Sequence, residues 1–246
     1  MGTSALLNRL SFYAEMAEGD VEQIKNIAGR PKTYARGADI ITAGQNLSEL
    51  LIVKSGWAIR YKTFEDGRRQ ILNVLLPGDF FDLQVMVAAE ADHSVSAVDD
   101  VDVLAIKPEI VRELFTGEGS VPLAFWWTQV QEEAFLREQI VRNGRQTARE
   151  RIGHFLLELH RRAQIANIST ENGFNLPLTQ AMIADALGLT SIHTNRVLRQ
   201  LAKEKLIEKT RSYVKFLDAD KLAEICDFDP AYFHLDAFNR RLKPPK

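Results

Sequence analysis

Residues 178–217 constrain the fold of this chain more than any other stretch, because two short helical patterns are followed there by a turn and two β-rich runs. Thr179 suits the N-cap of a helix whose apolar residues Ile183 and Leu187 lie four apart. Gly188 suits the left-handed residue that ends such a helix. The pattern predicts the first helix of a helix-turn-helix unit.

The second predicted helix starts near Thr190 or Ser191 and has a buried side and an exposed side. The buried stripe consists of Thr194, Val197, Leu198 and Leu201. The opposite side carries Ile192, Arg196, Arg199 and Lys203, with Ser191 and Asn195 at its edge. This face combines phosphate ligands, base-edge ligands and an apolar group for thymine methyls, which indicates DNA binding. The β-rich runs 206–209 and 213–217, joined by a turn at 210–212, predict a hairpin wing.

A basic amphipathic helix by itself can equally be a solvated surface. The surrounding residues favour DNA binding, because their order resembles the winged-helix half of the cyclic-AMP receptor protein/FNR (CRP/FNR) family of bacterial transcription regulators. That order is Thr179-Gln180, then Gly188-Leu189-Thr190-Ser191-Ile192-His193, then Asn195-Arg196. The resemblance implies DNA contacts from Thr179, Thr190, Ser191, Ile192, His193, Asn195, Arg196, Arg199, Lys203 and Arg211.

Arg196 is the expected base-reading residue, because it lies close to the N-terminal turn of the second helix, opposite its buried side. The arginine fork matches O6 and N7 of guanine, while Ile192, one turn earlier, suits a thymine methyl. The alternative is that Arg196 pairs with a neighbouring acid such as Asp185. Phosphate contacts are assigned to Arg199, Lys203 and Arg211.

The charge distribution predicts two domains with opposite properties. The chain has 246 residues, enough for two domains with cores of their own. Residues 145–215 hold twelve Lys/Arg and six Asp/Glu, whereas the excess of acidic residues lies in residues 1–144. A basic module joined to an acidic one fits a DNA-binding domain attached to a domain that stays off DNA.

Other features narrow the class of protein. No apolar run approaches the ~18 residues that span a bilayer, and residues 1–10 lack a secretory pattern. A cytoplasmic protein with no membrane partner is therefore expected. Cys226, the single cysteine, cannot form an internal disulfide or supply the thiolates of an iron–sulfur cluster, and it is expected to be a small buried side chain.

The first half of the chain predicts helices followed by a β domain. Residues 4–29 have helical spacing with breaks near Gly19 and Pro31. From residue 32 to 107 the pattern changes to short β-rich runs separated by Gly, Asp and Pro about every ten residues. This change predicts a β sandwich or barrel.

Several turn motifs in this β-rich part resemble the cyclic-nucleotide-binding jelly roll of the same family. They are Gly37 and Gly44, Val53-Lys54-Ser55-Gly56, Glu65-Asp66-Gly67-Arg68 and Pro77-Gly78-Asp79-Phe80-Phe81. Members that bind cyclic nucleotides place a Gly-Glu pair after the last turn and an Arg-Ser pair on the next strand. This chain has Asp82-Leu83 and His93-Ser94 there. Without the arginine a bidentate, always-charged phosphate ligand is missing, so ordinary cyclic AMP is not the expected effector.

His93, next to Asp92 and near Asp82, has two interpretations. It is part of a polar or pH-sensitive effector site, or it is a strand-edge histidine satisfied by a nearby carboxylate. The five histidines show no metal-ligand spacing, and no catalytic order of Ser, His and Asp stands out. Neither a metal cofactor nor an enzyme activity is expected.

Residues 121–144 predict one long helix with Pro122 in its first turn. Its bulky apolar residues cover more than one face, and the resemblance implies that it is the dimer helix; the alternative is burial on two sides within one monomer. In cyclic-AMP-binding relatives, two hydroxyl residues midway along this helix touch the adenine, where this chain has Leu136 and Arg137. Asn143-Gly144 is the expected hinge, followed by a helix over 149–162 and a polar loop over 167–175.

The sequence therefore predicts an α+β chain: a β jelly-roll sensor (residues 1–120), a dimerisation helix with a hinge (121–144) and a winged helix-turn-helix domain (145–246). The predicted function is that of a homodimeric transcription regulator that binds a palindromic operator in double-stranded DNA and works with RNA polymerase. Candidate positions for an unidentified small-molecule effector are Asp82, Leu83, His93, Ser94, Leu136 and Arg137. The alternatives are a cyclic-nucleotide-binding signalling module that does not read DNA, and a metal-binding enzyme of the cupin kind.

Overall fold

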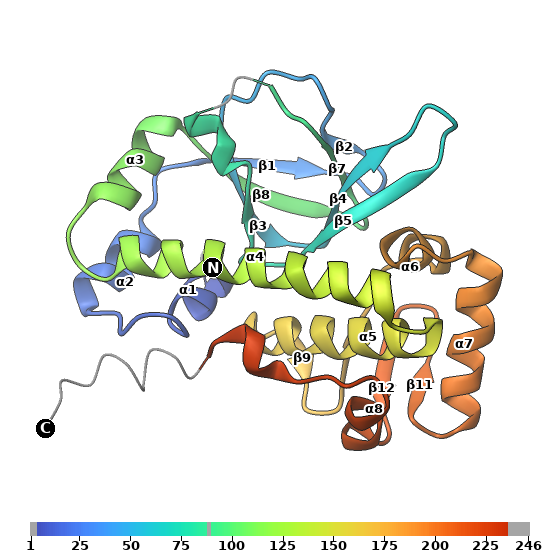
Figure 1. The fold of residues 1–246 in the computed structure, drawn as a ribbon. Coiled ribbons are helices and arrows are strands. Elements are labelled where there is room, and N and C mark those ends of the chain that lie inside the picture. The colour runs from blue at the N-terminus through green and yellow to red at the C-terminus, as the bar shows by residue number, and fades with distance from the viewer. Residues whose placement is uncertain (1–3, 88–89, 236–246) are drawn as a thin grey trace, which may run out of the picture.

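The computed structural model describes residues 4–87 and 90–235, and it consists of a β sandwich, a long helix and a winged helix-turn-helix domain (Figure 1). The predicted α+β architecture is confirmed. The last part of the predicted C-terminal domain, residues 236–246, lies outside the described residues.

Within residues 4–87 and 90–120, the N-terminal half begins with two short helices, continues with eight strands and ends with a helix. The helices are α1 (Ser4–Leu10), α2 (Glu18–Lys25), the 3-10 helix η1 (Leu83–Met86) and α3 (Pro108–Thr116). The strands are β1 (Arg30–Tyr34), β2 (Asp39–Ile41), β3 (Leu50–Ser55), β4 (Ala58–Thr63), β5 (Arg69–Leu75), β6 (Phe80–Phe81), β7 (Ser94–Ala97) and β8 (Val101–Ile106).

The strands form two antiparallel sheets with the orders β1-β8-β3-β6 and β2-β7-β4-β5. Side chains from both sheets, including Ile41, Val53, Val95 and Val103, form the buried layer between them. Gly56 ends β3 with φ of 75°, and a Cβ there would lie 2.1 Å from the carbonyl oxygen of Asp100. The close approach of two turns therefore requires glycine at this position.

The C-terminal half begins with the long helix α4 (Val121–Arg145), followed by α5 (Ala148–Ile165). The remaining elements are β9 (Ser169–Thr170), β10 (Gly173–Asn175), α6 (Gln180–Leu187), α7 (Ser191–Lys203), β11 (Ile207–Lys209), β12 (Tyr213–Phe216), α8 (Ala219–Ile225) and the 3-10 helix η2 (Pro230–Phe233). Figure 1 shows α4 running between the β sandwich and α5.

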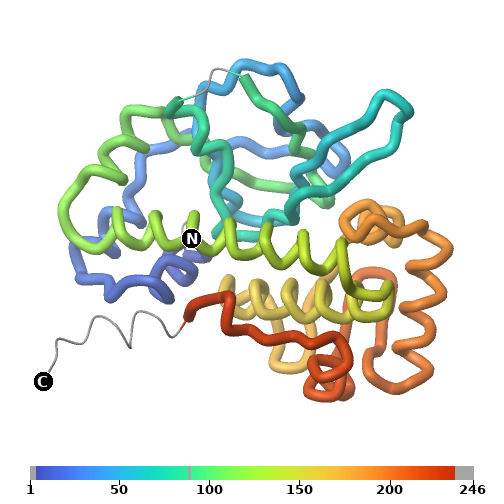
Figure 2. Tube along the Cα trace, viewed as in Figure 1, coloured from blue at the N-terminus to red at the C-terminus, as the bar shows by residue number. Residues whose placement is uncertain are grey.

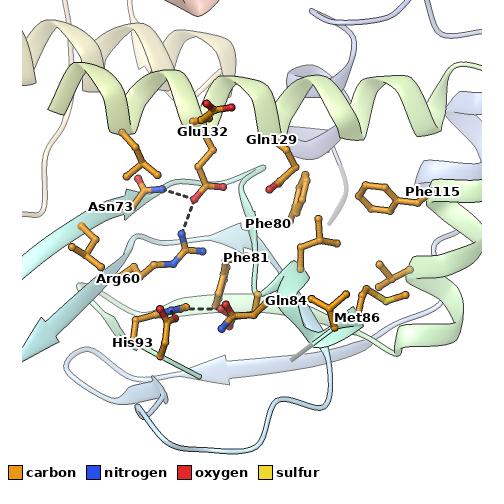
Figure 3. A pocket seen from close by; sticks show the side chains of 18 of the residues that line it. Arg60, Asn73, Phe80, Phe81, Gln84, Met86, His93, Phe115, Gln129 and Glu132 are labelled. Carbon is orange, nitrogen blue, oxygen red and sulfur yellow. Dashed lines mark hydrogen bonds and ion pairs between the residues drawn. The ribbon is translucent and has the colours of Figure 1, made fainter. Parts of the chain in front are cut away.

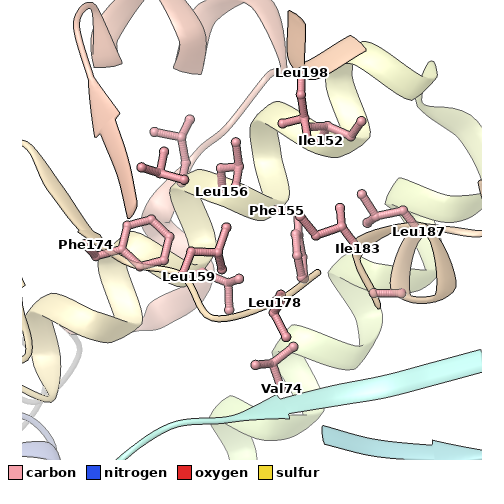
Figure 4. Packing of buried hydrophobic residues seen from close by; sticks show 14 of the residues in the cluster. Val74, Ile152, Phe155, Leu156, Leu159, Phe174, Leu178, Ile183, Leu187 and Leu198 are labelled. Carbon is pink, nitrogen blue, oxygen red and sulfur yellow. The ribbon is translucent and has the colours of Figure 1, made fainter. Parts of the chain in front are cut away.

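One hydrophobic cluster joins the β sandwich to the winged domain. Trp57 and Val74 of the sandwich belong to the same buried cluster as Phe155, Phe174 and Leu178. The rings of Trp57 and Phe174 stack with centroids 6.2 Å apart, and Figure 4 shows Val74 pointing toward Phe155 and Leu178. Because each fully buried large apolar side chain contributes about 1.5–3 kcal/mol, this contact holds the two parts firmly together.

Polar contacts extend the same interface. Strand β5 lies beside α6 (Figure 2), where Asp185 accepts hydrogen bonds from Arg69 at 2.8 and 3.0 Å. Gln70 donates to the carbonyl oxygen of Ala186 at 3.2 Å. The turn before β6 is tied to α5, since Asp79 accepts a 2.7 Å hydrogen bond from Arg162.

The structure differs from three sequence predictions. The break in the N-terminal helical region lies at residues 11–17, and Gly19 is inside the first turn of α2, where the carboxylate of Asp20 accepts from the Ala17 amide at 3.1 Å. The predicted loop 167–175 contains the hairpin β9–β10, because β10 pairs with β12 and gains backbone partners. The predicted hinge at Asn143-Gly144 is helical, and α4 ends only at Arg145.

The helix continues through the predicted hinge because Asn143 has a tertiary partner. Its side-chain amide donates to the carbonyl oxygen of Ala186 at 3.2 Å, and a glycine inside a helix costs only about 1 kcal/mol. The chain turns at Gln146 and Thr147 instead, where Thr147 and Glu150 form a capping box at the start of α5. Neither β1 nor α3 was among the predicted elements.

Candidate nucleic-acid interface and ligand cavity

Capping residues define the two helices of the helix-turn-helix unit. Thr179 precedes α6, and its hydroxyl oxygen accepts from the Met182 amide at 3.2 Å. Gly188 follows α6 with φ of 63°, as a left-handed C-cap. Thr190 caps α7 by accepting from the His193 amide at 3.2 Å. The predicted boundaries of both helices are confirmed.

The two sides of α7 differ in burial as their sequence predicts. Thr194, Val197, Leu198 and Leu201 are buried. Ser191, Ile192, Arg196, Arg199 and Lys203 are exposed, whereas His193 and Asn195 are half-buried. Ile192 is 85% exposed, so this side of the helix presents a large apolar side chain to solvent beside its arginines. We call the side that carries Ile192, Arg196 and Arg199 the α7 face.

The interpretation of Arg196 as a partner of Asp185 is wrong. Asp185 is occupied by Arg69 of the sandwich, as described above. Within residues 4–87 and 90–235, the guanidinium of Arg196 has neither a hydrogen bond nor an ion pair. Asn195 is less free, because its side-chain amide donates to Gln180 at 2.8 Å. The α7 face therefore presents an unpaired arginine to solvent.

The predicted hairpin wing follows α7. Strands β11 and β12 pair with Ile207 opposite Phe216, and Arg211 is exposed in the turn between them. A polar cleft of about 850 Å³ lies beside the wing and is lined by Thr179, Arg199 and Arg211 together with Arg36 of the sandwich. Asn195 also lines this cleft, so four of the predicted DNA-binding residues share one concave, positively charged surface.

A separate, mostly apolar cavity of about 800 Å³ lies between the sandwich, α3 and α4 (Figure 3). Of the six predicted effector positions, it is lined by Asp82, Leu83, His93 and Leu136. Ser94 and Arg137 are not part of its lining: the Ser94 hydroxyl accepts from the Ala43 amide at 3.1 Å, and Arg137 pairs with Glu133 at 2.6 Å. These two positions are therefore dropped from the candidate site.

His93 lies between two carboxylates at the side of this cavity. Its Nε2 is 3.0 Å from Oδ1 of Asp82, and its Nδ1 is 2.7 Å from Oδ1 of Asp92. The hydrogen bond with His93 holds the pKa of Asp92 below its usual value. His93 is 6% exposed and directly precedes β7, so it is a buried histidine at a strand edge satisfied by nearby carboxylates, and its side chain also lines the cavity.

Sequence reasoning missed the charged group on the opposite wall. Arg60 of β4 donates to Glu132 of α4 at 2.6 Å, and Asn73 of β5 donates to the same carboxylate oxygen at 3.0 Å (Figure 3). These residues lie 13 and 59 positions apart in the sequence. No local pattern connects them, since only the packing of α4 on the sandwich brings them together.

Other reactive groups are occupied or buried. Cys226 is fully buried, and burial raises the pKa of its thiol to about 12, so it lacks the thiolate that redox chemistry requires. Across the described residues, no group of three or more His, Cys, Asp and Glu side chains is arranged to hold a metal ion. In the same part of the chain, no helix has the length and hydropathy needed to cross a membrane.

Comparison with protein families gives two matches, one on each side of α4. Residues 31–118 match the cyclic nucleotide-binding domain, and residues 150–225 match the Crp-like helix-turn-helix domain. The first match covers the sandwich and the second covers α5 to α8. Both domain types therefore agree with the architecture described above.

Individual proteins are similar along most of the chain. The nitrogen fixation regulation protein FixK of Azorhizobium caulinodans is 32% identical over 79% of this chain and 81% of its own length. The transcriptional activator protein FnrL of Cereibacter sphaeroides is 30% identical over 76% and 74%. Among solved structures, FixK2 of Bradyrhizobium japonicum superimposes with a TM-score of 0.71 at 25% identity, over 80% of this chain and 96% of that one.

Proposed function

The chain belongs to the CRP/FNR family of DNA-binding transcription regulators, and on this premise we propose that two copies bind a palindromic operator through their α7 faces. Members of this family bind DNA through the helix-turn-helix and act as dimers, and the relatives named above are regulators, not enzymes. The match to a Crp-like helix-turn-helix domain removes the alternative of a signalling module that does not read DNA.

The observation that carries the proposal is the unpaired Arg196 on an exposed helix face. Arg196 is free to place its fork on guanine, and Ile192 is free to contact a thymine methyl. Ser191 and His193, in the first turn, and Asn195 are assigned to base or phosphate contacts. The remaining phosphate contacts are assigned to Thr179, Thr190, Arg199, Lys203 and Arg211.

The outward side of α4 supports pairing of two copies along this helix. Trp126 is 65% exposed, Ile140 is 73% exposed, and Leu123 and Val141 are also exposed. A stripe of large apolar side chains on one long helix is rarely left in solvent, and a second copy related by two-fold symmetry would cover it. Dimerisation through α4 would also set the distance between the two α7 helices.

Disruption of the stripe tests the dimer. Ile140→Glu combined with Trp126→Glu should give a monomer in light scattering at micromolar concentration, because two carboxylates would face their counterparts across the symmetry axis. Leu217→Glu is the matched control, since Leu217 is also exposed but lies after the wing. A native protein that is already monomeric, with or without DNA, would contradict the proposed pairing.

The cavity beneath α4 is assigned to an effector other than ordinary cyclic AMP. Asp82, Leu83 and His93 stand where nucleotide-binding relatives carry their ribose and phosphate ligands, and Leu136 stands near the adenine position. Calorimetry with cyclic AMP should show no binding at micromolar concentration. Tight binding that also strengthens DNA binding would overturn the assignment.

Cytoplasmic location and cooperation with RNA polymerase belong to the same proposal. Both are expected of a regulator that acts on bacterial promoters, and both are supported by the family to which the chain belongs. A signal in the jelly roll would act by changing how two α4 helices pair, and hence the spacing of the recognition helices.

Selection of bound duplexes from a random DNA pool, followed by titration of variants, tests the reading face. Arg196→Ala should weaken operator binding by about 1–3 kcal/mol and relax the preference at one position of each half-site. Lys203→Ala is the matched control, because loss of a phosphate contact should weaken all sequences alike and lower the salt slope by about one. Equal losses on operator and scrambled DNA for Arg196→Ala would refute base reading.

A further inference from the structure

The cavity beneath α4 has a chemical character that narrows its ligand. Its walls are largely apolar, with Leu72, Phe80, Leu83, Met86, Phe115 and Leu136 among them. Its volume of about 800 Å³ is in the range that holds a drug-sized molecule. Such walls accept an aromatic or aliphatic body, and the few polar groups decide which end group the body can carry.

The charged groups around the cavity disfavour an anion. Four carboxylates line it, from Asp82, Asp92, Glu132 and Glu133, but only two arginines, Arg60 and Arg112. Glu132 is paired with Arg60 at 2.6 Å, Glu133 with Arg137 at 2.6 Å, and Asp92 lies 3.6 Å from Lys62, while Arg112 is exposed. A phosphate or carboxylate inside would therefore meet the buried carboxylate of Asp82 without a free buried arginine or lysine beside it.

Asp82 provides a site for a hydrogen-bond donor and not for an anion. It is 3% exposed and lines the cavity, and its backbone is held at φ of 65°, a left-handed conformation that is uncommon for any residue except glycine. Its Oδ1 contacts His93, but its buried Oδ2 has no hydrogen-bond partner in the described part of the chain. A buried carboxylate oxygen without a donor is costly, and strained residues of this kind gather at ligand sites.

We propose that this cavity binds a neutral or cationic molecule with an apolar, preferably aromatic, body and an N–H or O–H group that donates to Oδ2 of Asp82. The assignment rests on the proposed function only in treating the cavity as the effector site. The N–H or O–H group of the ligand would be the hydrogen-bond partner that Oδ2 of Asp82 lacks. The apolar body of the ligand would fill the cavity between its apolar walls, as far as Leu136 on α4. The unpaired oxygen of Asp82 and the lack of a free buried arginine or lysine in the described lining both favour a donor end group over an anion.

Calorimetry on the full-length protein with four probes tests the proposed chemical class of the ligand. The probes are 2-phenylethylamine, 2-phenylethanol, 3-phenylpropionate and cyclic AMP, of which the first three share one aromatic body. The amine should bind most tightly, the alcohol less tightly and the carboxylate at least about tenfold more weakly than the amine. Cyclic AMP should not bind. A carboxylate that binds as tightly as the amine, or the absence of binding by every probe at millimolar concentration, would overturn the proposal.

Two matched variants test whether Asp82 accepts the hydrogen bond that the ligand donates. Asp82→Asn should weaken the amine by about tenfold, because the charge that the ammonium group recognises is removed. Asp92→Asn makes the same chemical change on the other side of His93, but its side chain is 68% exposed and should alter the affinity less than threefold. Equal effects of the two variants would place the amine elsewhere.

A third variant tests the cavity independently, in case Asp82→Asn fails to fold. Met86→Trp adds bulk on the cavity wall and should abolish binding of the amine and the alcohol alike, while the thermal unfolding curve stays cooperative. Operator binding, measured separately without probes, distinguishes the two proposals. Amine binding without operator binding would refute only the DNA-reading function, and operator binding without probe binding would refute only the ligand class.

Discussion

Helix α4 contributes to two clusters of charged side chains that differ in what surrounds them. The cavity cluster consists of Arg60, Asn73 and Glu132 and borders a space of about 800 Å³. The helix cluster consists of Arg142, His154, Glu158 and Tyr232: Glu158 accepts from Arg142 at 3.0 Å and from Tyr232 at 3.1 Å. The hollow next to it measures only about 10 Å³, hardly room for one water molecule.

A structural ion pair differs from one at a ligand site in the space that surrounds it. Arg142, His154 and Glu158 are 2%, 2% and 4% exposed, and the Arg142 guanidinium lies 5.5 Å from the ring centre of Phe155, so these three groups are closed off from solvent, whereas Tyr232 is half-buried. The cavity cluster makes a similar ion pair and, like Arg142, leaves a buried Nε atom of Arg60 without a hydrogen-bond partner among the described residues, but its residues line an open space of about 800 Å³. Only the second arrangement leaves room for a ligand.

The largest effect is expected for Glu158→Ala in the helix cluster. The substitution leaves the Arg142 charge buried and unpaired, and breaking a buried pair in this way costs about 3–5 kcal/mol. Urea unfolding measures the loss. Glu133→Ala, on the exposed side of α4, is the control and should change the free energy of unfolding by less than about 0.5 kcal/mol. A cost below about 1 kcal/mol for Glu158→Ala would mean that water can replace the carboxylate and that the cluster is not closed.

A pH dependence of stability should come from His154 in the same cluster. Burial, followed by the nearby Arg142 charge, lowers the pKa of His154 from 6.5 to about 4. Between pH 6.5 and 4 the unfolded chain therefore binds more protons at this residue than the folded one, so stability falls as the pH drops through that window. The expected loss is about 2–3 kcal/mol.

Urea unfolding of the native protein and of His154→Asn at pH 7, 5.5 and 4.5 measures this contribution. The variant should lose less stability on acidification than the native protein, because an amide does not take up a proton. Parallel pH profiles for the two proteins would show that His154 is hydrated, contrary to a closed cluster.

A smaller effect is expected for Glu132→Ala in the cavity cluster. Water from the open cavity can solvate Arg60 once its partner is removed, so the cost should be about 1–2 kcal/mol. The measurement is the same urea titration used for Glu158→Ala. If Glu132→Ala and Glu158→Ala lower the free energy of unfolding by the same amount, the cavity cluster and the helix cluster do not differ in their access to water.

The smallest effect should come from the exposed pair on the same helix. Arg137 and Glu133 lie one turn apart at 2.6 Å, with side chains 54% and 70% exposed. A double-mutant cycle with alanine should give an interaction energy of about 0.3–0.5 kcal/mol that disappears in high salt. A coupling above about 1 kcal/mol would indicate that this side of α4 is covered, for example by the second copy of a dimer.

The sequence predicted the α7 face well and the cavity in part, for a physical reason. The face is formed by one helix of thirteen residues, so helical periodicity alone separates its buried and exposed positions. The cavity is assembled from several elements between β4 and α4. Asp82, Leu83, His93 and Leu136 were identified through the family resemblance, whereas Arg60 and Glu132 carry no local signal.

The errors in the secondary structure have the same origin. Residues 167–175 are polar and read as a loop, yet β10 finds its partner in β12, about forty positions away. Asn143 and Gly144 are predicted to be a hinge, yet the Asn143 side-chain amide donates a hydrogen bond to the carbonyl oxygen of Ala186. In both places, contacts with residues distant in the sequence override the local secondary-structure preference. Local sequence patterns do not identify those distant residues.

The cluster that joins Trp57 and Val74 to Phe174 has a consequence for how such a chain can be rearranged by evolution or by engineering. Exchange of one sensor for another is straightforward only when the exchanged parts meet through a small or polar contact. Here the sandwich supplies buried side chains to the core of its neighbour. A transplanted sensor would have to bring its own equivalents of Trp57 and Val74, so the modules of this chain are inherited as a matched pair.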